Sequence, residues 1–242
     1  MTEWKPRTEL GKQVAAGTIT LEEIFSTGKK IKESEIIDML LPALQSEIIF
    51  IGGSPGKGGG IKRTPTKRTA RMHRSGRRYR VSALAVVGDG NGYIGVGASH
   101  SKEHKDAVDK AIHNAKLNVI TVKRGCGSWE CSCGGNHSIP IRITGGEGSN
   151  RVMLIPAPKG IGLCINDEAK KVLKLAGIRD VWSKSFGESR TRSNYTLSIF
   201  DAFRQMNRMK TEAVVKRPKP DGSHDYPDED EKSRRKKKGD DE

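Results

Sequence analysis

Residues 79–96, YRVSALAVVGDGNGYIGV, decide the fold of the first half of the chain. The run from Tyr79 to Val87 is rich in apolar and β-branched residues and predicts a strand, and Tyr93 to Val96 predicts a second one. Between them, Gly88 to Gly92 contains Asp-Gly and Asn-Gly, which adopt positive φ at little cost. The sequence therefore predicts a β-hairpin.

Further elements around this hairpin complete one predicted α/β unit over residues 34–124. Residues 34–41 predict a short amphipathic helix, and residues 47–51 predict a strand. Residues 101–118 predict a helix capped by its serine, with one apolar stripe that consists of Ala107, Val108, Ala111, Ile112 and Ala115. The order is three strands followed by a helix, and residues 119–122 are expected to extend out of the unit.

A second unit is predicted over residues 125–210. Its strands are expected at residues 139–143, 151–155 and 161–165. Asn166 opens a helix that Gly177 ends, and a last helix from about Ser193 presents an apolar face of Leu197, Phe200, Phe203 and Met206. The fold class is therefore α+β, with a sheet and helices in each of two successive domains.

Both ends of the chain differ from these units. Residues 1–33 carry few apolar positions and are expected to form an arm without a core of its own. Residues 211–242 have no apolar period and predict a disordered charged tail. The chain shows neither a signal peptide nor an apolar run of the roughly 18 residues that span a bilayer, so we expect a cytoplasmic protein without membrane contact.

Positive charge is concentrated between the first predicted strand and the hairpin. The chain has 44 Lys and Arg against 29 Asp and Glu, a net charge of +15, and no acidic residue lies between Ile48 and Gly88. Neutralising phosphates releases condensed counterions, so such a cluster favours nucleic acid as the partner, although a solvated loop or a localisation signal would look similar. The candidate RNA-binding residues are Lys57, Lys62, Arg63, Lys67, Arg68, Arg71, Arg74, Arg77 and Arg78.

The glycine-rich segment from Gly52 to Pro65 is expected to be a flexible basic loop. A phosphate-binding loop needs a glycine five residues before Gly56 and a hydroxyl residue after Lys57. Ile51 and Gly58 occupy those positions instead. The spacing therefore argues against a nucleotide-dependent enzyme.

Three cysteines and a histidine form the pattern C-x₄-C-x-C-x₃-H, and they are Cys126, Cys131, Cys133 and His137. Thiolates and imidazole suit tetrahedral Zn²⁺, but C-x-C is tighter than the usual C-x₂-C pair. Structural zinc and reduced thiols in a loop both remain open, whereas a catalytic Cys–His pair is disfavoured because no orienting acid follows it in the sequence and the segment is rich in glycine. Cys164, within a predicted strand, is interpreted as a small buried residue.

Two tryptophans are further candidates for RNA contact. Trp129 and Trp182 could stack on bases, as aromatic side chains do in RNA interfaces. Packing in the core or between domains explains single tryptophans equally well. The sequence leaves both alternatives open.

Residues 80–97, together with the helix that follows them, resemble the family of universal small-subunit ribosomal protein five. Residues 156–163 and 175–181 resemble the second domain of that family, and residues 124–131, RGCGSWEC, look like its archaeal branch. The resemblance implies a first domain of double-stranded-RNA-binding type, a second β/α domain, and residues 69–80 as the RNA-contacting hairpin. It also implies contact with ribosomal protein four, messenger RNA nearby, and roles in subunit assembly and decoding accuracy.

Three functions are therefore compared. A structural protein of the small ribosomal subunit, bound to ribosomal RNA and without enzymatic activity, agrees with both the basic segment and the resemblance. A general RNA or DNA chaperone would use the same basic surface without joining a subunit. A nucleotide-dependent enzyme at Gly52 to Gly58 is the third, and the spacing of its glycines argues against it. No cofactor is required for the first function, and a structural zinc is compatible with it.

Overall fold

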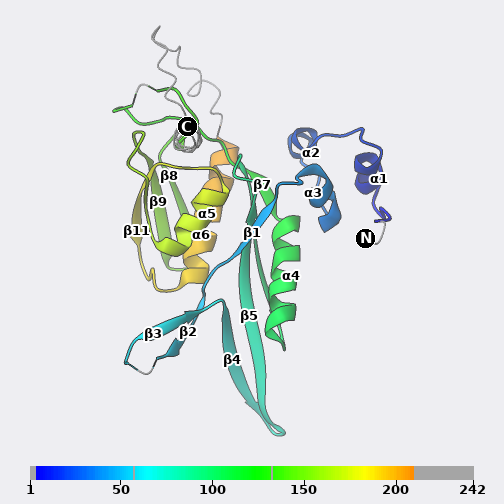
Figure 1. Cartoon of the computed structure of the whole chain (residues 1–242), viewed down its shortest axis with the longest axis vertical. Helices are drawn as coiled ribbons and strands as arrows, with labels where there is room; N and C mark the ends of the chain where they lie inside the picture. The colour runs from blue at the N-terminus through cyan, green and yellow to red at the C-terminus, as the bar shows by residue number, and fades with distance from the viewer. Residues whose placement is uncertain (1–3, 57, 132, 210–242) are drawn as a thin grey trace, which may run out of the picture.

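The computed structural model describes residues 4–56, 58–131 and 133–209 of the chain. Its first sheet has five strands, ordered β1-β5-β6-β7, with β4 paired to the other half of β5. The strands are β1 Gln45–Ile48, β4 Thr66–His73, β5 Gly76–Gly88, β6 Tyr93–Ser101 and β7 Val119–Thr121. Helix α4, His104–Leu117, lies along one face of this sheet (Figure 1).

Small residues let α4 lie close to the sheet. The α4 residues that face the sheet include Ala107, Ala111 and Ala115, and all three are fully buried. A Cβ added to Gly97 of β6 would lie 2.2 Å from the backbone nitrogen of Ala115, so this position of the strand has room only for glycine. The predicted apolar stripe of this helix thus meets a glycine-containing strand.

The second sheet has four strands in the order β10-β11-β9-β8. They are β8 Ile143–Glu147, β9 Asn150–Pro156, β10 Leu163–Cys164 and β11 Val181–Phe186. Helices α5, Asp167–Leu175, and α6, Arg192–Arg208, lie on one side of this sheet (Figure 1). The side chain of Asn166 caps α5 by accepting a hydrogen bond from the backbone N–H of Glu168.

A continuous core joins the two sheets. The face of the first sheet opposite α4 contributes Leu84, Val86, Ile94 and Val96 to one buried cluster with Val172, Leu173, Phe200 and Phe203 of the second unit. The backbone N–H of Gly90, in the turn between β5 and β6, donates to the carbonyl of Leu175 at 2.9 Å. Helices α5 and α6 are therefore covered by a sheet on each side.

The N-terminal arm has a small core, contrary to expectation. Helices α1 Glu9–Ala15 and α2 Leu21–Thr27 pack with α3 Ser34–Leu40 around the buried side chains of Val14, Ile24 and Ile36. Helix α3 was predicted from its apolar pattern, but α1 and α2 each contribute too few apolar residues to show one, so the cluster becomes evident only when the three helices are brought together.

Several predicted element boundaries were wrong. Residues 52–55 and 61–64, predicted within a loop, instead pair with each other as β2, Gly52–Pro55, and β3, Ile61–Thr64. Ser101 pairs with Val81 as the end of β6, so Glu103 precedes α4 instead. Residues 119–121 do not extend out of the unit but pair with β6 as β7. The strand predicted at residues 139–143 begins only at Ile143, as β8, and β11 was not predicted at all. The tail predicted at 211–242 lies outside the described residues.

Candidate RNA interface and metal centre

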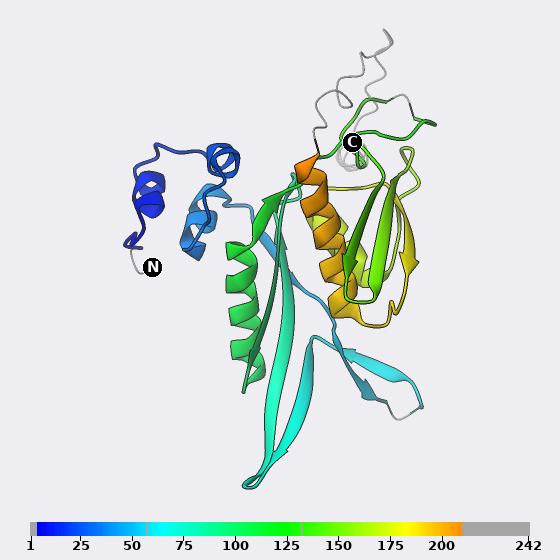
Figure 2. The same ribbon diagram turned by 180° about the vertical axis from the view of Figure 1, so that it is seen from behind.

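The β4–β5 hairpin projects past both α4 and the second sheet, as Figures 1 and 2 show from opposite sides. Its core contacts end at Thr66 and Val81, which are buried, while residues 67–75 and 77–80 are all exposed. The residues that the resemblance implies as the RNA-contacting hairpin therefore form a two-stranded ribbon with a turn at Arg74 and Ser75.

Strand register distributes the predicted cations over both faces of this ribbon. Arg71 lies directly opposite Arg78, and Lys67 is on the same face. Arg68 and Arg77 are on the other face, where the guanidinium of Arg68 lies 3.6 Å from the centre of the Tyr79 ring. RNA could therefore approach from either side or at the tip.

Repulsion between like charges lowers the stability of this ribbon when no partner is bound. Like charges placed directly opposite each other on neighbouring strands are destabilising, as at Arg71 and Arg78. Isolated two-stranded ribbons are also only marginally stable in water. A phosphate chain laid along the ribbon would remove the repulsion and release counterions, which is the chemistry of nucleic-acid binding.

The β2–β3 hairpin brings two more of the predicted residues close to this ribbon. Lys62 and Arg63 lie on β3, and both are exposed. The two hairpins meet at their bases, where the hydroxyl of Thr64 donates to the carbonyl of Thr66 at 2.8 Å. Lys57 lies outside the described residues.

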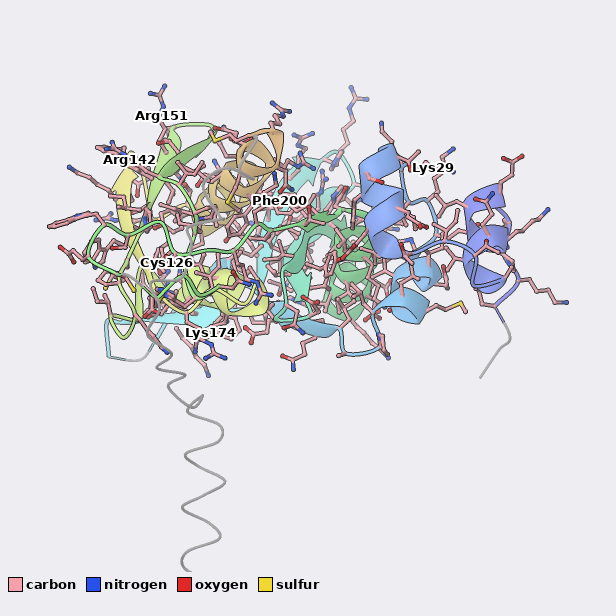
Figure 3. All side chains as sticks on the ribbon, turned by 90° about the horizontal axis from the view of Figure 1, so that it is seen from above. Lys29, Cys126, Arg142, Arg151, Lys174 and Phe200 are labelled. Carbon is pink, nitrogen blue, oxygen red and sulfur yellow. The ribbon has the colours of Figure 1, made fainter. Side chains whose placement is uncertain are left out.

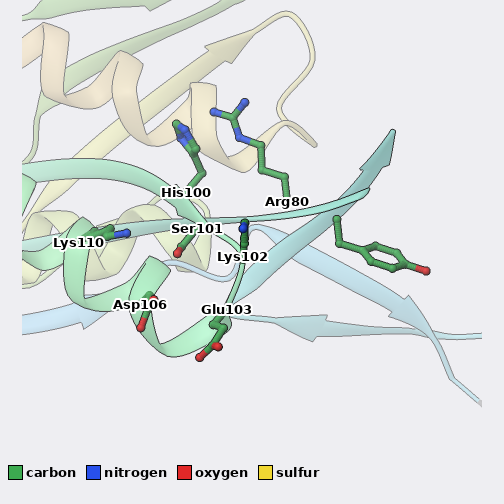
Figure 4. Close-up of a pocket in the computed structure, with 8 residues that line it drawn as sticks. Arg80, His100, Ser101, Lys102, Glu103, Asp106 and Lys110 are labelled. Atoms are coloured by element: carbon green, nitrogen blue, oxygen red, sulfur yellow. The ribbon is translucent and has the colours of Figure 1, made fainter. Parts of the chain in front are cut away.

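A shallow hollow at the base of the β4–β5 hairpin carries charges that the sequence analysis did not single out (Figure 4). It lies between β5, β6 and the start of α4, and it is lined by Tyr79, Arg80, His100, Ser101, Lys102, Glu103, Asp106 and Lys110. Because acidic and basic side chains alternate here, the hollow is a weaker attractor of phosphate than the ribbon beyond it.

The cysteine segment brings its four predicted ligands together. One sulfur each from Cys126, Cys131 and Cys133, and a ring nitrogen of His137, all lie within 4.8 Å of one another. Figure 3 labels Cys126 at the second-sheet end of the molecule, opposite the N-terminal helices. The sulfur of Cys131 is 3.8 Å from Nε2 of His137. Three thiols and an imidazole at this spacing match the donor set of structural zinc.

The environment of the cluster shifts the pKa of two of its thiols in opposite directions. Burial, together with hydrogen bonds to Cys133 and Cys131, raises the pKa of Cys126 to about 12. Burial also opposes ionisation of Cys131, but hydrogen bonds from the backbone of Lys159 and Cys133 and from neighbouring thiols outweigh it and lower its pKa to about 6. The cluster thus already stabilises one thiolate.

Asp180 is a functional candidate that the sequence analysis missed. Its Oδ2 lies 2.8 Å from Nδ1 of His137, and both side chains are buried. The two residues are 43 positions apart, so no local spacing linked them.

Three further side chains can now be placed. Trp129 is 85% exposed, at the tip of the cysteine segment, so it does not pack in the core. Trp182 is half-buried on β11. Cys164 is exposed and not buried as predicted, because β10 is a two-residue edge strand.

Comparisons with known proteins agree on one family. The family model for the N-terminal domain of ribosomal protein S5 matches residues 65–123, and the model for its C-terminal domain matches residues 145–217. Proteins named small ribosomal subunit protein uS5 are similar over most of the chain. That of Methanocaldococcus jannaschii is 46% identical over 86% of this chain and 90% of its own length. Those of Nanoarchaeum equitans and Picrophilus torridus are 44% and 47% identical, over 87% and 84% of this chain and 90% and 86% of their own lengths. Within the described residues, no helix is long and apolar enough to cross a membrane.

Proposed function

The chain belongs to the ribosomal protein S5 family, and we propose that its β4–β5 hairpin is the principal surface by which it binds ribosomal RNA. Members of this family are structural proteins of the small ribosomal subunit, and this chain is accordingly a structural constituent and not an enzyme. The site to be explained is therefore a binding surface.

One observation carries the proposal. Exposed cations occupy both faces and the turn of a ribbon that has no acidic residue to balance them. Phosphate contacts position a protein on RNA, and helical RNA is recognised mainly by its shape, backbone and 2′-hydroxyls. A narrow cationic ribbon fits such a backbone-directed role. The neighbouring residues Lys62 and Arg63 of β3 would extend the contact.

Finer features follow from the family resemblance. We propose that the first domain, with its antiparallel sheet and α4 on one face, is of double-stranded-RNA-binding type. We further propose that the chain works in cytoplasmic ribosomes beside ribosomal protein four and near messenger RNA. There it would support subunit assembly and decoding accuracy.

Sedimentation tests the RNA-binding proposal. Wild-type chain and the double variant Arg71→Glu/Arg78→Glu are each produced in cells and followed through a sucrose gradient. The wild type should co-sediment with small subunits at moderate salt, and the variant should remain largely in the free fraction. Equal incorporation of both proteins would overturn the role given to the hairpin. Equal affinity for unrelated RNAs without subunit association would instead favour a general chaperone.

We also propose that Cys126, Cys131, Cys133 and His137 hold a structural Zn²⁺ ion. The proposal is supported by the closeness of their donor atoms, which all lie within 4.8 Å of one another. A bound ion would tie together the ends of a loop, Cys126 to His137, that contains three glycines but few apolar side chains. Because four ligands hold one tetrahedral Zn²⁺ ion, protein purified without chelator should contain about one equivalent of zinc by elemental analysis. Less than about a tenth of an equivalent would remove the proposal.

A further inference from the structure

We infer that Asp180 is a positioning residue of the proposed metal centre. Its carboxylate orients the imidazole of His137 so that Nε2 of the ring becomes the metal-binding atom. The inference rests on the proposed zinc site and deepens it. Asp180 lies immediately before β11, far along the chain from the cysteine segment. Nevertheless its Oδ2 contacts Nδ1 of His137 at 2.8 Å.

Backbone contacts hold both partners in place. The other carboxylate oxygen, Oδ1, accepts hydrogen bonds from the amides of Gly160 at 3.1 Å and Gly162 at 2.8 Å. The carbonyl of His137 accepts from the amides of Arg179 at 2.8 Å and Asp180 at 3.1 Å. Asp180 is 4% exposed. Because Oδ1 is occupied by the two glycine amides, the carboxylate is fixed in an orientation in which Oδ2 faces the imidazole of His137.

This contact determines which ring nitrogen can bind a metal. A neutral imidazole has one N–H donor and one lone pair. Because a carboxylate oxygen can only accept, Nδ1 carries the hydrogen and donates to Asp180, and the lone pair is then on Nε2. That atom is the one that points to the sulfur of Cys131, 3.8 Å away. Metal-binding histidines are commonly oriented by a carboxylate in this way.

The arrangement links the metal to the second sheet. Asp180 holds the loop between β9 and β10 through Gly160 and Gly162, whose φ angles are +96° and +78°. The imidazole of His137 and the amides of this loop therefore share one carboxylate. Zinc, this loop and the start of β11 should therefore behave as one unit, so binding of zinc stabilises the second domain.

Zinc competition against a chromophoric chelator tests the inference in the full chain. Asp180→Asn should lower zinc affinity about 10- to 100-fold, the usual effect of losing such a partner. Asp201→Asn is the matched control, because that carboxylate also accepts from a glycine amide, Gly146, at 3.1 Å but lies on α6. It should leave zinc affinity unchanged.

A double-mutant cycle separates positioning from a general structural effect. If Asp180 acts through the imidazole, adding Asp180→Asn to His137→Ala should cause no further loss of zinc affinity. Cobalt-substituted wild type and Asp180→Asn should also differ in their visible absorption, which reports the ligands of the ion. Unchanged affinity in Asp180→Asn, or an equal further loss in the His137→Ala background, would overturn the inference while the zinc site stands. Wild-type protein without zinc would overturn both.

Discussion

Arg74 lies in the turn of the β4–β5 hairpin, where it is exposed and remote from the core. Replacing it with alanine should raise the Kd for ribosomal RNA several-fold, because alanine cannot neutralise a phosphate. The free energy of unfolding should change by less than about 0.5 kcal/mol, as for surface positions in general. RNA binding and thermal unfolding are measured on the same preparation. Lys12→Ala on α1 removes an equal charge and should change neither quantity, whereas a fall in Tm for Arg74→Ala would show that this residue supports the fold.

Glu168 has a structural role that its neighbour lacks. Its carboxylate is buried and contacts Arg192 at 3.0 Å, Lys171 at 3.3 Å and the backbone N–H of Phe50 at 3.0 Å. Glu168→Gln leaves two cations without their acid, so it should lower the free energy of unfolding by about 3 kcal/mol. Asp167→Asn, at an exposed ion pair with Lys170, should have no measurable effect in the same urea titration. Equal effects would contradict the role of burial.

At this scale the sequence predicted charge better than contact. Arg71 and Arg78 could be chosen as RNA candidates because their charge does not depend on the fold. The four proposed metal ligands also stood out as a spacing in the sequence, and the structure brings their donor atoms within 4.8 Å of one another. Asp180 was not, since its partner is brought near only by the second sheet, and Cys164 was misplaced because burial of a two-residue edge strand depends on what lies beside it.

Strands that leave the core were harder to detect than strands within it. Residues 66–78 lack the apolar alternation of a half-buried strand because both faces of the ribbon are exposed, so the residue pattern alone predicted no strand there. The same reason applies to β2 and β3. Alternation reports a buried face and not the pairing itself. Hairpins that leave the core are therefore read as loops.

Close packing of α4 on β6 gives a prediction for these elements. Gly97→Ala would place a methyl group against the backbone of α4, so the helix must move away, and the cost should be about 1–3 kcal/mol of unfolding free energy. Ala98→Ser, at the exposed next position, should be nearly neutral. Chemical denaturation of both variants measures the difference. A neutral Gly97→Ala would contradict the close contact between this strand position and the backbone of α4.

The molecule as a whole is held by a core that both sheets share. Apolar residues of β5 and β6 are buried with those of α5 and α6 in one cluster. The described part of the chain should therefore unfold in one cooperative transition, with equal calorimetric and van't Hoff enthalpies. Differential scanning calorimetry measures both values. Two separate transitions would show that the domains are energetically independent.

The α+β class with two successive sheets could be predicted because each unit carries its own apolar periods. The shared core could not be predicted. An apolar face on a strand or helix shows that the face is buried, but it does not show whether its partner belongs to the same unit or to the other one. Leu84 and Val86, for example, indicate a strand with a buried face but not its partner. The small N-terminal core around Ile24 was missed for a related reason: α1 and α2 each supply too few apolar residues to be recognised alone as partners of α3.

The salt dependence of RNA binding tests the central claim most directly. The Kd for purified small-subunit ribosomal RNA is measured across a series of salt concentrations for the wild type, for Arg71→Gln/Arg74→Gln/Arg78→Gln, and for the control Lys12→Gln/Lys29→Gln/Lys30→Gln. If the hairpin neutralises phosphates, the first variant should reduce the slope of log K against log salt by about three, one for each arginine replaced. The control, with the same net charge, should keep the wild-type slope. An unchanged slope for the hairpin variant, or an equal reduction for both variants, would contradict the assignment of RNA binding to this ribbon.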